Sequence, residues 1–139
     1  MNLKKELDNK IFDIVKNASE KLGYESFVVG GWVRDLLLNN KNKKDIDFVC
    51  IGSGIKLARE VHNLIPNSKI STYSNFGTAL VSCEDINYEF IGARKESYRE
   101  NSRNPIIENG SLEDDQKRRD FTINCLYVKL VGENYGELL

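Results

Sequence analysis

Apolar residues recur along this chain with two different periods, and the changes of period define the predicted elements. Over residues 3–22 they fall three or four positions apart, as in an amphipathic helix, and Gly23 ends that run. The same spacing predicts three more helices: one over residues 32–38, begun at Gly30-Gly31, one over 53–64, and one capped by Ser111 that continues through 116–124. Short runs rich in β-branched and aromatic residues predict strands over residues 24–29, 45–51, 69–73, 78–83, 86–93 and 127–131.

The order of these elements predicts the fold class. Glu84-Asp85 is a short turn between two strand runs, which indicates a hairpin. Residues 39–44 are a polar loop, and residues 94–110 are polar, contain Pro105 and lack a period, so we expect a long loop there. A hairpin with few long crossovers favours an α+β fold, a mixed β-sheet flanked by helices, over a Rossmann fold.

Composition limits the classes of function. With 139 residues, of which 40% are hydrophobic and 29% charged, the chain is typical of one globular domain. Its net charge of −1 argues against binding nucleic acid by bulk electrostatics, so any such contact should be local. The first ten residues resemble no signal peptide, and no apolar run is long enough to span a membrane. We therefore expect a cytoplasmic protein without a membrane partner.

The cysteines and the histidine exclude several kinds of site. Cys50, Cys83 and Cys125 are far apart among apolar neighbours, so we expect buried thiols and neither disulfides nor a zinc site. His62 is the single histidine, and we expect it on a helix surface or half-buried. A histidine-rich metal site is thereby excluded. Carboxylates and arginines must carry most of any chemistry.

Two acids lie one residue apart in the strand-like segment KKDIDFV. Side chains alternate along a strand, so Asp45 and Asp47 share one face, roughly 7 Å apart at the backbone, while Ile46 and Phe48 face the core. Oxygen ligands alone favour Mg²⁺ or Mn²⁺. The same pair is also typical of the polar face of a half-exposed strand. Glu89 lies on the polar face of a strand that could neighbour this pair, although alone it could equally be a solvated residue.

A glycine pair separates the first predicted strand from the helix that follows it. Without side chains, Gly30 and Gly31 would let a phosphate approach backbone N–H groups, and Arg34 lies one turn later. The segment is neither a GxGxxG fingerprint nor a P-loop. Taken alone, it could be only a tight connection.

Three segments together, VVGGWVRDLLLNNKNKKDIDFV, YEFIGAR and RRDFTINCL, carry a family resemblance over nearly the whole chain from Tyr24 onward. They closely resemble the catalytic head of the class II tRNA nucleotidyltransferase (CCA-adding) and bacterial poly(A) polymerase family, in the DNA polymerase β-like nucleotidyltransferase superfamily. The resemblance implies that fold, with residues 1–139 as the catalytic head and the family's neck, body and tail absent from this chain. The implied site consists of the metal ligands Asp45 and Asp47, the third carboxylate Glu89, and the nucleotide-binding residues Gly30, Gly31, Arg34, Arg118, Arg119, Asp120 and Asn124. Asp35 more plausibly ties the turn together.

The resemblance also implies the reaction and its partners. Two Mg²⁺ ions, or Mn²⁺, would support template-independent transfer of nucleotides from CTP or ATP to an RNA 3′ end, releasing pyrophosphate. The RNA expected is a tRNA that receives CCA, bound mainly by regions outside this chain. Poly(A) synthesis, or a metal- and nucleotide-binding module without turnover, are the alternatives. A metal-dependent phosphohydrolase is a third, because paired acids serve there too.

Overall fold

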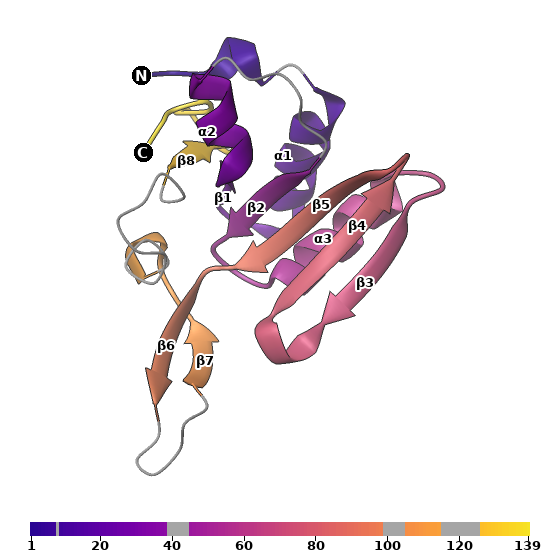
Figure 1. Cartoon of the computed structure of the whole chain (residues 1–139), viewed down its shortest axis with the longest axis vertical. Coiled ribbons are helices and arrows are strands. Elements are labelled where there is room, and N and C mark those ends of the chain that lie inside the picture. Colours follow the sequence, from indigo (N-terminus) through magenta and orange to yellow (C-terminus); the bar gives the residue numbers. More distant parts are fainter. Residues whose placement is uncertain (8, 39–44, 99–104, 115–125) are drawn as a thin grey trace.

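A six-stranded mixed sheet forms the centre of the fold (Figure 1), and the computed structural model describes residues 1–7, 9–38, 45–98, 105–114 and 126–139. The strands lie in the order β3-β4-β5-β2-β1-β8. Only β2 and β5 pair in parallel, and the other neighbours in this sheet are antiparallel. The predicted mixed sheet is thereby confirmed. Its strands are β1 (Ser26–Val29), β2 (Ile46–Cys50), β3 (Lys69–Tyr73), β4 (Thr78–Cys83), β5 (Ile86–Gly92) and β8 (Tyr127–Lys129).

Local signals set where the helices begin and end. The Asn9 side chain accepts a hydrogen bond from the backbone N–H of Ile11, and Ser53 does the same for Lys56. Because Asn9 is a cap, the helix expected over residues 3–22 is wrong in its first part, which instead contains a single 3₁₀ turn. The helices are η1 (Lys4–Glu6), α1 (Lys10–Leu22), α2 (Gly31–Leu37), α3 (Gly54–Leu64) and η2 (Ser74–Phe76).

The main core lies between one face of the sheet and helices α1 and α3, which run behind the strands in Figure 1. Ile46 and Phe48 point into it, as their alternation predicts. The Phe48 ring stacks on Phe90 with centroids 5.2 Å apart, and Phe12 of α1 meets Phe48 edge-on at 6.1 Å. Since side chains alternate, Asp47 between these two core residues must point to the opposite face.

The opposite face of the sheet carries a second, smaller apolar cluster. Phe27 and Tyr127 pack edge-to-face there with centroids 6.1 Å apart, and Leu112 lies against them. Val29 belongs to this cluster and pairs with Asp47 in the antiparallel register of β1 and β2. The cluster therefore lies on the same face of the sheet as Asp47 and next to it.

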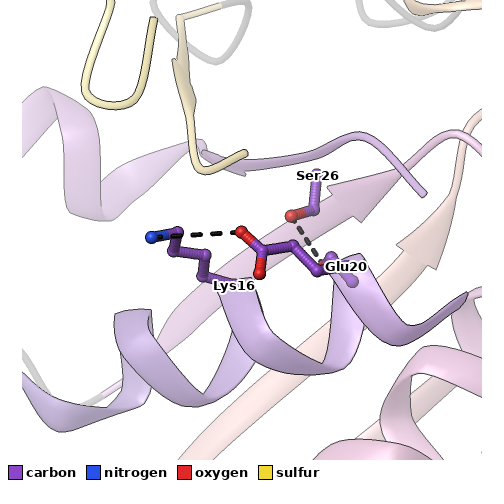
Figure 2. Close-up of polar contacts among 4 residues, drawn as sticks. Lys16, Glu20 and Ser26 are labelled. Carbon is purple, nitrogen blue, oxygen red and sulfur yellow. Dashed lines mark hydrogen bonds and ion pairs between the residues drawn. The ribbon is translucent and has the colours of Figure 1, made fainter. Parts of the chain in front are cut away.

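A buried pair of hydroxyls joins α1 to β1. Ser19 and Ser26 are both fully buried, and Ser19 Oγ donates to Ser26 Oγ at 2.8 Å. Figure 2 shows Ser26 of β1 near the more exposed Lys16–Glu20 ion pair of α1. In this pair Lys16 Nζ and Glu20 Oε1 are 3.9 Å apart. The serines satisfy each other where water is excluded.

Residues 94–110 were expected to be a loop, and that expectation is wrong. Strands β6 (Arg94–Tyr98) and β7 (Pro105–Asn109) form a separate antiparallel ribbon, which projects from the end of β5 in Figure 1. Gly110 closes its base by donating from its N–H to the carbonyl of Ala93 at 2.9 Å. Pro105 begins β7, a position where a strand tolerates proline.

The predicted Ser111 cap is confirmed. Its hydroxyl accepts a hydrogen bond from the N–H of Asp114 at 3.2 Å, and the Asp114 carboxylate accepts one from the N–H of Ser111 at 3.0 Å. This reciprocal pair is a capping box. The rest of the helix expected through residues 116–124 lies outside the described residues, as does the loop expected over residues 39–44.

The cysteines and the histidine follow the predictions in part. Cys50 is buried as expected, and burial raises the pKa of its thiol to about 12. Cys83 is only half-buried because it ends β4 at a turn, so the expectation was wrong there, and Cys125 is outside the described residues. His62 is half-buried on α3, with its Nδ1 2.7 Å from Ser68 Oγ. Among the described helices, none has both the length and the apolar character needed to cross a bilayer.

Candidate functional site

The acids of the predicted metal site meet at the parallel β2–β5 pair. Asp47 on β2 is in register with Glu89 on β5, and residues paired in this way point to the same face. Asp45 lies one residue before β2 and is exposed, whereas Asp47 and Glu89 are half-buried. Glu89 is therefore placed beside Asp47, as expected for a neighbouring strand. This placement depends on β5 pairing with β2.

Asp45 has a backbone hydrogen-bond partner that no sequence pattern predicts. Its Oδ1 accepts a hydrogen bond from the N–H of Asn87, at the start of β5, at 3.2 Å. The carboxylate is thus tied to the strand that also carries Glu89. The only signal in the sequence is the position of Asn87 two residues after the Glu84-Asp85 hairpin turn.

The donor set suits a cation that also binds phosphate. Within the described residues, no three acidic, histidine or cysteine side chains lie close enough to hold a metal ion alone. Mg²⁺ is commonly held by one or two carboxylates, with substrate phosphates and water completing its octahedron. Asp45 and Asp47 fit that requirement, and Glu89, in register with Asp47, could supply a further oxygen ligand.

Gly30 leaves space directly beside Asp47. A Cβ at Gly30 would lie 3.5 Å from Asp47 Oδ2, and the Gly30 backbone has φ +74° and ψ −140°. This conformation is strained for residues with side chains. Gly30 also precedes α2, and its carbonyl accepts the first helical hydrogen bond from the N–H of Arg34 at 3.1 Å. Gly30 therefore allows the turn into α2 and leaves the space beside the Asp47 carboxylate free of a side chain.

Arg34 lies in the last turn of the short helix α2, and its side chain folds back over Gly31. Its Nη2 lies 3.4 Å from where a Cβ of Gly31 would be, and its Nε donates to Asp35 Oδ1 at 3.0 Å. The Arg34 side chain is 40% exposed, so its guanidinium retains donors directed at solvent. Asp35 contacts this arginine, in agreement with a role in holding the turn.

The remaining predicted nucleotide-binding residues are Arg118, Arg119, Asp120 and Asn124, and all four lie outside the described residues. The structure therefore describes two parts of the site. One is the set of carboxylates on and next to β2 and β5, and the other is the turn from β1 into α2, with its two glycines and Arg34. The two parts meet where Gly30 faces Asp47. This arrangement can hold a divalent cation beside an anion.

Comparisons with known proteins agree with the fold and with the motif order. Residues 26–139 match the family model described as the Poly A polymerase head domain. The chain is 38% identical over 117 residues to an A-adding tRNA nucleotidyltransferase of Aquifex aeolicus, covering 82% of this chain and 14% of that protein. It is 37% identical over 131 residues to a CCA-adding enzyme of a Geobacillus species, covering 93% of this chain and 31% of that one.

One solved structure that resembles this fold is a tRNA nucleotidyltransferase complexed with a primer tRNA and an incoming ATP analogue. It superimposes with a TM-score of 0.72 at 35% identity, over 90% of this chain and 33% of that one. This chain thus spans a third or less of the length of these relatives.

Proposed function

The chain belongs to the poly(A) polymerase head-domain family of class II tRNA nucleotidyltransferases, and on that premise we propose that it is a catalytic head that transfers nucleotides to an RNA 3′ end. The observation that supports this most strongly is the placement of Gly30 against Asp47, with Glu89 in register on the next strand. The glycine turn, which would accept an anion, therefore lies next to the acids that would bind a cation. A nucleoside triphosphate with its bound Mg²⁺ requires both.

The proposed roles follow from the chemistry of each group. Asp45 and Asp47 would hold Mg²⁺ or Mn²⁺, with Glu89 as the third carboxylate of the site. Asp45, Asp47 and Glu89 would hold these ions where the bound metal would supply Lewis-acid activation of the RNA 3′-hydroxyl and neutralise the departing pyrophosphate. Gly30 and Gly31 give the triphosphate access to the backbone, and Arg34 adds positive charge there.

For the substrate, we propose CTP and ATP added to the 3′ end of tRNA. The named relatives include both A-adding and CCA-adding enzymes, and a related structure contains a primer tRNA with an ATP analogue. Arg118, Arg119, Asp120 and Asn124 are proposed to contact the phosphate and sugar of the nucleotide. Glycine and arginine at this turn offer no matched donor and acceptor to a base edge, so base choice is assigned to regions beyond this head.

A transfer assay tests this proposal. The chain is incubated with labelled CTP or ATP, Mg²⁺ and tRNA lacking its 3′ end. Label incorporated into tRNA supports transfer, and addition of A alone, of CCA or of a poly(A) tail separates the three polymerising activities. Release of free nucleoside monophosphate would indicate a phosphohydrolase, and binding without turnover would indicate a binding module.

A further inference from the structure

At the start of β5, the backbone of Asn87 contacts Asp45, and the proposed site gives Asn87 no role. We propose that Asn87 is a positioning residue for the metal-binding carboxylate. Its N–H holds Asp45 Oδ1 at 3.2 Å and leaves the second oxygen for the cation. This inference rests on the proposed function, because it takes Asp45 to be a metal ligand. Residues that orient a ligand in this way typically change metal affinity 10- to 100-fold when they are lost.

The hairpin geometry explains why the Asn87 N–H is directed at β2. Cys83 and Ile86 flank the Glu84-Asp85 turn, and the residues next to a two-residue turn exchange hydrogen bonds with each other. The next pair, Ser82 and Asn87, is then a pair without mutual backbone hydrogen bonds. The N–H of Asn87 therefore points away from β4 and toward β2, where Asp45 accepts it.

A side-chain hydrogen bond from β4 also holds Asn87, on the side away from β2. Ser82 Oγ donates to Asn87 Oδ1 at 2.8 Å, which links β4 to Asn87, and Asn87 to Asp45. Both side chains line a polar hollow of about 430 Å³. Because the Asn87 side chain borders this hollow and not the core, it can be shortened without opening a cavity among apolar residues.

A matched pair of variants separates the backbone donor from the side chain. Asn87→Pro removes the N–H without removing a hydrogen bond between β4 and β5, whereas Asn87→Ala retains that N–H. Mn²⁺ binding to the full chain is measured by electron paramagnetic resonance of the unbound ion, in the parent and both variants. We expect Asn87→Pro to weaken Mn²⁺ binding about tenfold and Asn87→Ala to stay within about twofold of the parent.

Equal Mn²⁺ affinity in the parent and a folded Asn87→Pro variant would overturn the inference while leaving the proposed function intact. A parent that binds no Mn²⁺ would overturn both. Should thermal unfolding show that Asn87→Pro does not fold, amide NMR decides. Mg²⁺ should then shift the Asn87 amide resonance in the parent, and in Asp45→Ala this amide should exchange at least tenfold faster without responding to Mg²⁺. An unmoved Asn87 resonance in a parent that binds Mg²⁺, or unchanged exchange in Asp45→Ala, contradicts the inference.

Discussion

Asp47 and Glu89 occupy the same register position on the parallel strands β2 and β5, on the sheet face opposite α1 and α3. Like charges placed directly across a sheet destabilise it. A cation between the two strands would turn this repulsion into attraction. On the proposed metal assignment, the stability of the sheet should therefore increase when a cation binds.

This link predicts how one substitution changes the metal-dependent stability. Asp47→Asn should abolish the rise in melting temperature that Mg²⁺ gives the parent, since a ligand stabilises only the state that binds it. Thermal unfolding with and without Mg²⁺ provides the measurement. An equal Mg²⁺-dependent rise in parent and variant would contradict the metal assignment of Asp47.

The two adjacent glycines should differ in their tolerance of a methyl group. Gly30→Ala places a side chain on a backbone of φ +74°, so we expect a loss of about 1–3 kcal/mol in the free energy of unfolding. Gly31→Ala is the matched control, because among the described residues its Cβ would meet only the flexible end of the Arg34 side chain, at 3.4 Å. Urea unfolding of both variants measures the difference. Equal losses would show that the Gly30 backbone is not the constraint.

The β4–β5 turn should be easy to stabilise. Glu84 and Asp85 have φ of +51° and +65°, a left-handed pair typical of a type I′ turn, in which Asn-Gly is preferred. Replacing the pair by Asn-Gly should raise the free energy of unfolding by about 1 kcal/mol because this strain is relieved. Chemical denaturation provides the measurement. A destabilised variant would mean that the acidic side chains stabilise the turn by contacts of their own.

The buried Cys50 thiol predicts a loss of stability at alkaline pH. Its pKa rises from 9.0 to about 12 on folding because burial disfavours the thiolate. The unfolded chain therefore releases this proton first, and the free energy of unfolding should fall as the pH rises from 9 toward 12. Cys50→Val should reduce that slope and leave the part due to Tyr88 and Tyr135, whose pKa values burial also raises. Unfolding curves at pH 8, 9, 10 and 11 provide the comparison, and identical slopes would contradict a buried thiol.

Much of the fold could be read from the sequence because local chemistry determines it. The Glu84-Asp85 hairpin, the Ser111 cap and the Gly23 stop were predictable, since each depends on neighbouring residues alone. The β6–β7 ribbon was not, because β6 is mostly polar and neither strand has an alternating apolar pattern. Asn9 was also overlooked as a cap, because the apolar spacing continues across it through Leu3 and Leu7.

The candidate site was predictable in its motifs but not in its connections. Asp45 and Asp47 share a face by alternation alone, so their relationship follows from sequence. The adjacency of Asp47 and Glu89 depends on β5 pairing with β2, which is a choice of neighbour between strands about 40 residues apart that no local pattern encodes. For the same reason, the hydrogen bond from the Asn87 N–H to Asp45 could be seen only in the folded chain.

Isothermal titration of this chain with Mg²⁺–ATP and Mg²⁺–CTP tests the central claim that Asp45 and Asp47 form the metal part of a nucleotide site. We expect weak binding of both nucleotides with affinities within tenfold of each other, because the described residues of the site face phosphate and metal and not a base. Asp45→Asn and Asp47→Asn should each abolish the binding heat, whereas Asp13→Asn, an exposed acid on α1, should leave it unchanged. Undiminished Mg²⁺–nucleotide affinity in folded Asp45→Asn and Asp47→Asn chains would contradict the claim.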